Sequence, residues 1–237
     1  KLKVRLIKEN LDELSEDKAD GIIALGKFDA KQVKRLQKLN EPLLFVDFDG
    51  MLYGQDSLVV DFQQAVDLVI DHFIKTGHEK IGILSGIEYT KESRNEIADP
   101  RKQFFQQRLT RLRMFHPEFM IAGEFTVNGG YQGMKHFLET AHELPTALFA
   151  SSDALAVGAL RAIQEAGLKV PEDISVIGFN DVSVAKYISP ALSTVHVPTE
   201  WMGEMALATM VDVAREKAPV PRKITIGTQL VLRDSAK

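Results

Sequence analysis

Short apolar runs alternate along the chain with longer segments in which apolar residues recur at helical spacing. The short runs are typical of buried strands, and they are 21–25, 43–46, 81–84, 147–150 and 174–179. Segments with helical spacing follow them, at 30–39, 62–75, 101–114, 131–141, 154–165 and 201–217. Strand and helix alternate in this way in α/β folds, so the pattern predicts parallel sheets covered by helices.

The stretch 146–181 contains the clearest unit of this kind. Ser151, Ser152 and Asp153 can cap the helix that follows the apolar run 147–150. Gly167 suits a left-handed helix end, and Pro171 prevents the helix from continuing. A second strand then ends at Asn180, so the stretch predicts a β-α-β unit whose strands are parallel.

The remaining elements are shorter or less regular. We expect a polar helix at 11–18 and a long polar loop at 85–100; we expect strands at 3–7, 58–60 and 119–122, a crossover at 193–197 and a closing strand pair at 224–232.

Composition excludes several classes of protein. The 237 residues are 45% hydrophobic and 26% charged, which is ordinary for a globular protein. The formal net charge is −4, whereas a chain that binds the phosphates of nucleic acid by itself is normally positively charged. There is no cysteine, and we found no membrane-spanning stretch or signal peptide, so we expect a cytoplasmic protein.

Polar clusters follow both strands of the β-α-β unit. Ser151, Ser152 and Asp153 come after the first strand, and Asn180 and Asp181 after the second. Ligands of open parallel sheets bind beyond the carboxyl ends of the strands. The clusters are therefore candidates for a ligand site, although helix capping and turn formation explain the same residue types.

Five stretches of the chain form a recognisable set of motifs: ADGIIALG at 19–26, KTGHEKIGILSG at 75–86, DPRKQFF at 99–105, the β-α-β stretch at 146–181 and SPALSTVHVPTEWMG at 189–203. Together they resemble the lactose-repressor family of bacterial sugar-responsive transcription regulators, and more narrowly its galactose-repressor branch. The resemblance implies an α/β fold of two doubly wound parallel-sheet lobes joined by hinge strands, as in type I periplasmic-binding-protein-like domains. The lobes are expected to be 1–60 with 199–227, and 61–198 with 228–237.

The family pattern also implies an upstream extension. Its first lobe has the strand order 2-1-3-4-5, and this chain starts at what matches the second strand. We therefore expect a missing central strand upstream, and before it a helix-turn-helix headpiece that binds operator DNA and is absent from this chain.

The resemblance assigns five ligand-binding residues, of which Arg101 and Phe125 are two. Arg101 opens a helix, where a cation gains nothing from the positive helix end, and it matches the family's Arg-x-x-Gly-aromatic pattern except that Phe104 replaces the glycine. A guanidinium suits paired sugar hydroxyls. Phe125 matches an aromatic that stacks on the apolar face of a sugar.

The other three candidates are Asp47, Ser152 and Asn180. Asp47 matches a pocket acid that accepts hydrogen bonds from hydroxyls. Ser152 stands where many relatives have asparagine, and Asn180 where many have aspartate, which changes the hydroxyl pattern that the site satisfies. The sugar cannot be named from these departures.

We therefore expect a regulator that is not an enzyme and that binds no cofactor or metal. A small, galactose-like carbohydrate would bind between the lobes, and lobe closure would be transmitted to the DNA-binding domain. The family's homodimer contacts match the helix 155–163 and Tyr187–Ile188.

Two alternatives remain open. One is a periplasmic-type sugar-binding protein for transport, which shares the two-lobed architecture. The other is a magnesium-dependent phosphatase of the haloacid-dehalogenase type, because LFVDFDG at 44–50 resembles its nucleophile motif, with Asp47 as nucleophile and Ser85 in a second motif. The sequence around Asp181 supplies only part of the acidic metal motif that such an enzyme needs.

Overall fold

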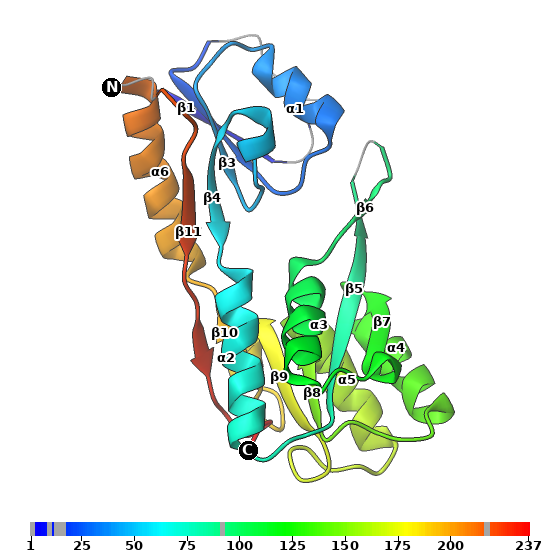
Figure 1. Ribbon diagram of the computed structural model, residues 1–237. Helices are drawn as coiled ribbons and strands as arrows, with labels where there is room; N and C mark the ends of the chain where they lie inside the picture. Colours follow the sequence, from blue (N-terminus) through cyan, green and yellow to red (C-terminus); the bar gives the residue numbers. More distant parts are fainter. Residues whose placement is uncertain (1–2, 9–10, 12–17, 91–92, 216–218) are drawn as a thin grey trace. The chain divides into compact units, whose positions relative to one another are not determined.

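The chain forms two compact units, each built around its own sheet (Figure 1). The computed structural model describes residues 3–8, 11, 18–90, 93–215 and 219–237. The first unit consists of Lys1–Asp61, Tyr89–Glu96 and Pro198–Ile226, and the second of Phe62–Glu88, Ile97–Val197 and Gly227–Lys237.

One segment departs from the expected lobes. Residues 89–96 were expected in the second lobe, but they belong to the first unit. The reason is a pair of hydrogen bonds to the buried carboxylate of Asp29, which accepts from the backbone N–H of Ser93 at 3.2 Å and from its hydroxyl at 2.6 Å.

The first unit contains a five-stranded sheet in which every strand pairing is parallel. Its strands, in order across the sheet, are β1 (Val4–Lys8), β2 (Gly21–Leu25), β3 (Leu43–Val46), β4 (Asp56–Val60) and β11 (Lys223–Ile226). Strand β1 pairs directly with β2, from Val4–Gly21 to Lys8–Leu25. This pairing satisfies backbone groups of β2 that would otherwise be unpaired.

Two helices of this unit pack against β2. Helix α1 (Ala30–Gln37) begins with a capping box of Asp29 and Gln32, and it buries Val33 in one cluster with Ile22. Helix α6 (Thr199–Arg215) approaches Gly21, where an added Cβ would lie 2.2 Å from the sulfur of Met210. A short 3-10 helix, η1 (Met51–Tyr53), follows β3. The polar helix predicted at 11–18 falls largely outside the described residues.

The second unit contains the larger sheet. Its strands run in the order β12 (Gln229–Val231), β10 (Ser193–His196), β9 (Ser175–Asn180), β8 (Ala147–Ala150), β5 (Ile81–Tyr89) and β6 (Glu96–Ile97), and β7 (Met120–Glu124) also pairs with β5. Strands β5, β7, β8, β9 and β10 are parallel, and β12 is antiparallel to β10. The predicted closing strand pair therefore consists of β11 and β12, which belong to different sheets.

The prediction of a polar loop at 85–100 is wrong for residues 85–89. Strand β5 continues to Tyr89, and its extension pairs with β7 as far as Ile87–Glu124. Pairing with a neighbouring strand overrides the local polarity of the segment.

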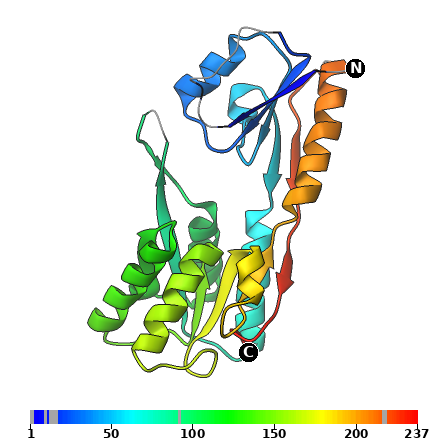
Figure 2. The ribbon, with the colours of Figure 1, turned by 180° about the vertical axis from the view of Figure 1, so that it is seen from behind.

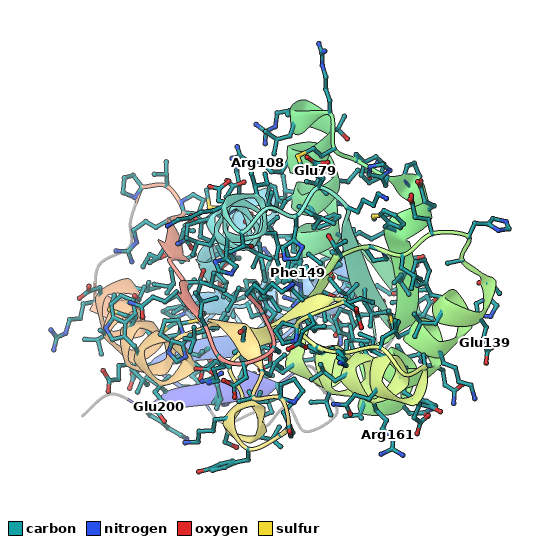
Figure 3. The ribbon with its side chains drawn as sticks, turned by 90° about the horizontal axis from the view of Figure 1, so that it is seen from below. Glu79, Arg108, Glu139, Phe149, Arg161 and Glu200 are labelled. Carbon is teal, nitrogen blue, oxygen red and sulfur yellow. The ribbon has the colours of Figure 1, made fainter. Side chains whose placement is uncertain are left out.

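Helices cover both faces of the second sheet, as a doubly wound fold requires. Helices α2 (Phe62–Lys75) and α3 (Pro100–Leu112) lie on one face, and α4 (Val127–Thr140) and α5 (Asp153–Glu165) on the other (Figures 1 and 2). Two 3-10 helices, η2 (Pro117–Phe119) and η3 (Ser183–Lys186), complete the unit. Phe149 of β8 lies among the packed side chains in Figure 3, whereas Arg161 and Glu139 extend from their helices.

Helix α5 faces the core of its own unit. Leu155, Leu160 and Ile163 are at most 3% exposed, because α5 packs against the sheet on one side and α4 on another. These side chains are therefore buried within their own unit, and the dimer contacts expected for 155–163 stay a prediction for the other residues of the helix.

Candidate functional site

Arg101 lies among three aromatic rings of the second unit. It occupies the first turn of α3, and its side chain is only 14% exposed. Its guanidinium carbon lies 5.0 Å from the ring centre of Phe179, 5.2 Å from that of Phe125 and 5.4 Å from that of Phe62. Rings at such distances attract a cation and restrict where the guanidinium can lie.

Asp99 holds Arg101 in this position. Its Oδ1 accepts hydrogen bonds from the backbone N–H of Arg101 at 3.0 Å and from the Nε–H at 2.7 Å, and its Oδ2 accepts from the hydroxyl of Ser85 at 3.0 Å. Asp99 is the N-cap residue of α3 and is buried. This carboxylate compensates both the cation and the positive helix end, so Arg101 is stabilised by Asp99 and not by the helix end itself.

The two Nη groups of Arg101 remain available. Among the described residues, the hydrogen bonds of the guanidinium are confined to Nε, so Nη1 and Nη2 have no protein acceptor. Polar groups of mostly buried side chains are generally hydrogen-bonded to protein, water or ligand. Arg101 therefore presents a fixed pair of donors to an acceptor from outside the protein.

Phe125 packs directly on the backbone of β5. It follows β7, and a Cβ added at Gly86 would lie 2.3 Å from its ring. Only glycine leaves the space that the ring needs at this point. The ring therefore supports Arg101, and its expected stacking on a sugar stays a prediction.

Ser152 and its neighbour lie at the carboxyl end of β8. The hydroxyl oxygen of Ser152 accepts from the backbone N–H of Leu155 at 3.2 Å, so Ser152 caps α5. Its hydroxyl hydrogen can still donate to a ligand. Ser151 is fully buried, and its Oγ has no partner within the described part of the chain.

Asn180 ends β9 next to Phe179, with an exposed side chain and a positive φ of 113°. The following residue, Asp181, also has a positive φ, of 59°. Its carboxylate pairs with Arg233 at 2.7 Å and with Nδ1 of His196 at 3.1 Å. Asp181 thus holds the turn, while Asn180 is left for contacts outside the protein.

A buried carboxylate fixes the segment after β9. Asp153 is 1% exposed, and it accepts from the hydroxyl of Thr194 at 2.5 Å and from the backbone N–H of Val182 at 2.8 Å. Burial raises the pKa of Asp153 above the ordinary value of a carboxyl group. A Cβ at Gly178 would lie 2.3 Å from this carboxylate, so glycine is needed there.

Asp47 lies in the first unit, after β3. It is a non-glycine residue with a positive φ of 62°, and its side chain is 40% exposed. The ammonium group of Lys27 pairs with its carboxylate at 2.8 Å and also donates to its backbone carbonyl. The carboxylate keeps acceptor capacity beyond this one pair.

Part of this arrangement was predictable from the sequence. Arg101 and Phe125 were predicted, and the structure brings them into contact. Phe62 and Phe179 were treated as elements of a helix and a strand, and Asp99 as part of a motif, because no local pattern reveals which side chains surround Arg101. The one sequence signal that could have pointed to Asp99 is that an aspartate directly before Pro-Arg suits an N-cap.

Two kinds of site are not found within the described residues. No group of three or more histidine, aspartate and glutamate side chains is placed to hold a metal ion. In the same part of the chain, no helix has the length and apolar character needed to cross a membrane.

Comparison with known proteins places these features in context. A family model described as a periplasmic binding protein-like domain matches residues 70–236. The HTH-type transcriptional regulator GalR of Streptococcus thermophilus is 38% identical over 221 residues, which are 92% of this chain and 66% of that protein. GalR of Lacticaseibacillus casei is 35% identical over 229 residues, 96% of this chain and 69% of that protein. The chain spans about two thirds of the length of these relatives.

A solved structure extends the comparison. The transcriptional regulator CelR in complex with cellobiose matches with a TM-score of 0.78 and 26% identity, over 92% of this chain and 66% of the CelR chain. The similarity covers both units, so the two sheets and their helices follow one known architecture.

Proposed function

Since this chain belongs to the lactose-repressor and galactose-repressor family, with the periplasmic-binding-protein-like effector domain of those regulators, we propose that it binds a small carbohydrate and transmits this binding to a DNA-binding domain. The family is non-enzymatic, which removes the phosphatase hypothesis. The compared relatives are transcription regulators, so regulation is preferred to transport.

The main observation behind this proposal is that Arg101 is held in place but keeps unused hydrogen-bond donors. The side chain is mostly buried and held by Asp99 and three rings, yet both Nη groups lack a protein acceptor among the described residues. Two parallel donors of fixed direction match adjacent hydroxyl oxygens on a sugar ring. The donors lie near the carboxyl ends of the parallel strands, where open α/β sheets bind their ligands.

The other predicted residues complete the proposed contact set. Asn180 has both an amide donor and an acceptor, Ser152 retains a hydroxyl hydrogen, and Phe125 offers an apolar surface. Asp47 of the first unit is proposed as an acceptor for a sugar hydroxyl. A galactose-like effector is the proposed ligand, since the two relatives compared above are GalR proteins.

The DNA and subunit partners are also proposals. Both relatives are named HTH-type regulators, where HTH stands for helix-turn-helix. We therefore propose a helix-turn-helix headpiece that binds operator DNA in the cytoplasm. We propose that the chain forms a homodimer through the segment around η3. Tyr187 is 77% exposed, Val184 47% and Val182 43%, which is a large apolar exposure for so short a segment.

Calorimetric titration with a panel of mono- and disaccharides tests the ligand proposal. We expect the wild type to bind at least one sugar, and Arg101→Ala to weaken that binding roughly ten- to a hundredfold, because charge-assisted hydrogen bonds contribute about 1.5–3 kcal/mol. Lys102→Ala is the matched control, since Lys102 is the exposed neighbour on the same helix. Equal binding by wild type and Arg101→Ala would remove Arg101 from the site, and a wild type that binds no sugar contradicts the proposed function.

A further inference from the structure

Three cations near the strand ends are each paired with a carboxylate. In the second unit, Arg101 pairs with Asp99 and Arg233 with Asp181, both at 2.7 Å. In the first unit, Lys27 pairs with Asp47 at 2.8 Å. A ligand that meets the groups of the second unit therefore meets ion pairs whose charges are already compensated.

Two positive helix ends of the second unit, those of α3 and α5, are compensated as well. Asp99 caps α3, and Asp153 lies buried in the first turn of α5. An acidic residue in this position offsets the partial positive charge that otherwise attracts anions to a helix N-terminus. Exposed Glu124, at the end of β7, adds negative charge to the same edge of the sheet.

Asp99 offsets the positive charge of the Arg101 guanidinium, which carries the Nη donors. Its Oδ1 contacts Nε of Arg101 at 2.7 Å, while the Nη groups stay free. The guanidinium thus keeps its directional donors, but its charge is offset at the shortest possible range. Directional donors without net positive charge suit hydroxyl oxygens better than phosphate or carboxylate oxygens, which gain most from an uncompensated cation.

We propose that Asp99 is a specificity-determining residue, which restricts the site to uncharged carbohydrates and disfavours sugar phosphates and sugar acids. Asp99 is a positioning residue, because it acts through Arg101 and not by contact with the ligand. This inference rests on the proposed function, since it names the charge class of the ligand at the same site.

Asp99→Asn changes the charge and keeps the hydrogen bonds. The asparagine Oδ1 can still accept from both N–H groups of Arg101, as Oδ1 of Asp99 does. Its Nδ2 can donate to the hydroxyl oxygen of Ser85, whose own hydrogen can turn to the backbone carbonyl of Gly86, 3.4 Å away. Asparagine is also as good an N-cap residue as aspartate. The variant should therefore fold like the wild type.

The experiment compares D-galactose and D-glucose with their 6-phosphates and their uronic acids by calorimetry, on the wild type and on Asp99→Asn. We expect the wild type to bind an uncharged sugar at least tenfold more tightly than its anionic derivatives. We expect Asp99→Asn to reduce that ratio by about tenfold or more, since one nearby charge changes the affinity for another by roughly that factor. Binding of the anionic sugars by the variant should also weaken more steeply with salt.

Ser85→Ala is the control, because it removes the hydrogen bond to Oδ2 of Asp99 and leaves the charge unchanged. The preference of Ser85→Ala for an uncharged sugar over its anionic derivatives should equal that of the wild type. The inference is overturned if the wild type prefers a sugar phosphate or acid, or if Asp99→Asn leaves the ratio unchanged. If the wild type binds none of these probes and no sugar of the wider panel, the proposed function itself fails.

Discussion

At the residue scale, two of the five predicted ligand residues, Asp47 and Asn180, have a strained backbone. Asn180 has a φ of 113° and Asp47 one of 62°, and both directly follow or end a buried strand. Positive φ angles cost most non-glycine residues free energy, although asparagine and aspartate tolerate them better than others. Strain of this kind persists where a side chain is needed, and ligand sites are common among such places.

Asn180→Gly tests whether this strain serves binding. Glycine adopts positive φ without steric cost, so we expect the free energy of unfolding to rise by about 1 kcal/mol while sugar affinity falls through loss of the amide. Denaturant unfolding and calorimetry measure the two effects. Asn40→Gly is the control, because Asn40 has a φ of 57° after α1 and is not a predicted ligand residue, so it should change stability alone. Unchanged sugar affinity in Asn180→Gly would remove Asn180 from the site.

At the element scale, the position of α4 depends on close contact with α5. The sequence suggested a helix starting at Tyr131, after two glycines, but α4 begins at Val127 with Thr126 as its N-cap. The glycines lie inside the helix because the neighbouring helix leaves no room for a side chain. A Cβ at Gly130 would lie 2.3 Å from the carbonyl oxygen of Leu155, and one at Gly158 would lie 2.0 Å from that of Val127.

Gly158→Ala should therefore destabilise the second unit. The atoms that its Cβ would meet belong to the backbone of α4, so relief requires the two helices to separate, and we expect a loss of about 3 kcal/mol. Gly203→Ala, in the exposed part of α6, has nothing within 4 Å of the new Cβ. That control should gain about 0.5–1 kcal/mol from higher helix propensity. Urea unfolding of both variants checks the prediction, and equal stabilities would contradict the close packing.

At the scale of the whole molecule, distant chain segments meet around His78 in the second unit. The buried imidazole follows α2, and its Nδ1 lies 3.0 Å from the hydroxyl oxygen of Thr146, just before β8. Its Nε2 has no partner within the described residues. Burial lowers the pKa of His78, and the charges of Lys237 and His72 lower it further.

This lowered pKa makes stability depend on pH. The unfolded chain takes up a proton near the ordinary histidine pKa of about 6.5, whereas the folded chain does so only at lower pH. The contribution of His78 to stability is therefore complete above about pH 6.5 and is lost as pH falls toward the folded pKa. We expect unfolding midpoints to fall more between pH 7.5 and 5.5 for the wild type than for His78→Asn, whose amide keeps a contact with Thr146 without titrating. Parallel curves would contradict this role.

Local patterns were sufficient for most of the secondary structure. The apolar runs predicted β2, β3 and β8 with their observed limits, and helical spacing did so for α2. Gly167 follows its helix at positive φ, as expected, and Gly77 does the same after α2. These features follow from side-chain period and backbone stereochemistry, which act between residues close in the sequence. The family resemblance added the division into two lobes and the ligand role expected of Arg101.

Long-range contacts determined the rest. The direct pairing of β1 with β2, the extension of β5 and the glycines inside α4 depend on partners that a local pattern does not contain. The same is true of the three rings around Arg101, which come from segments far apart in the chain. Pairing and packing energies depend on which surfaces meet in three dimensions, so they appear only when the chain has folded.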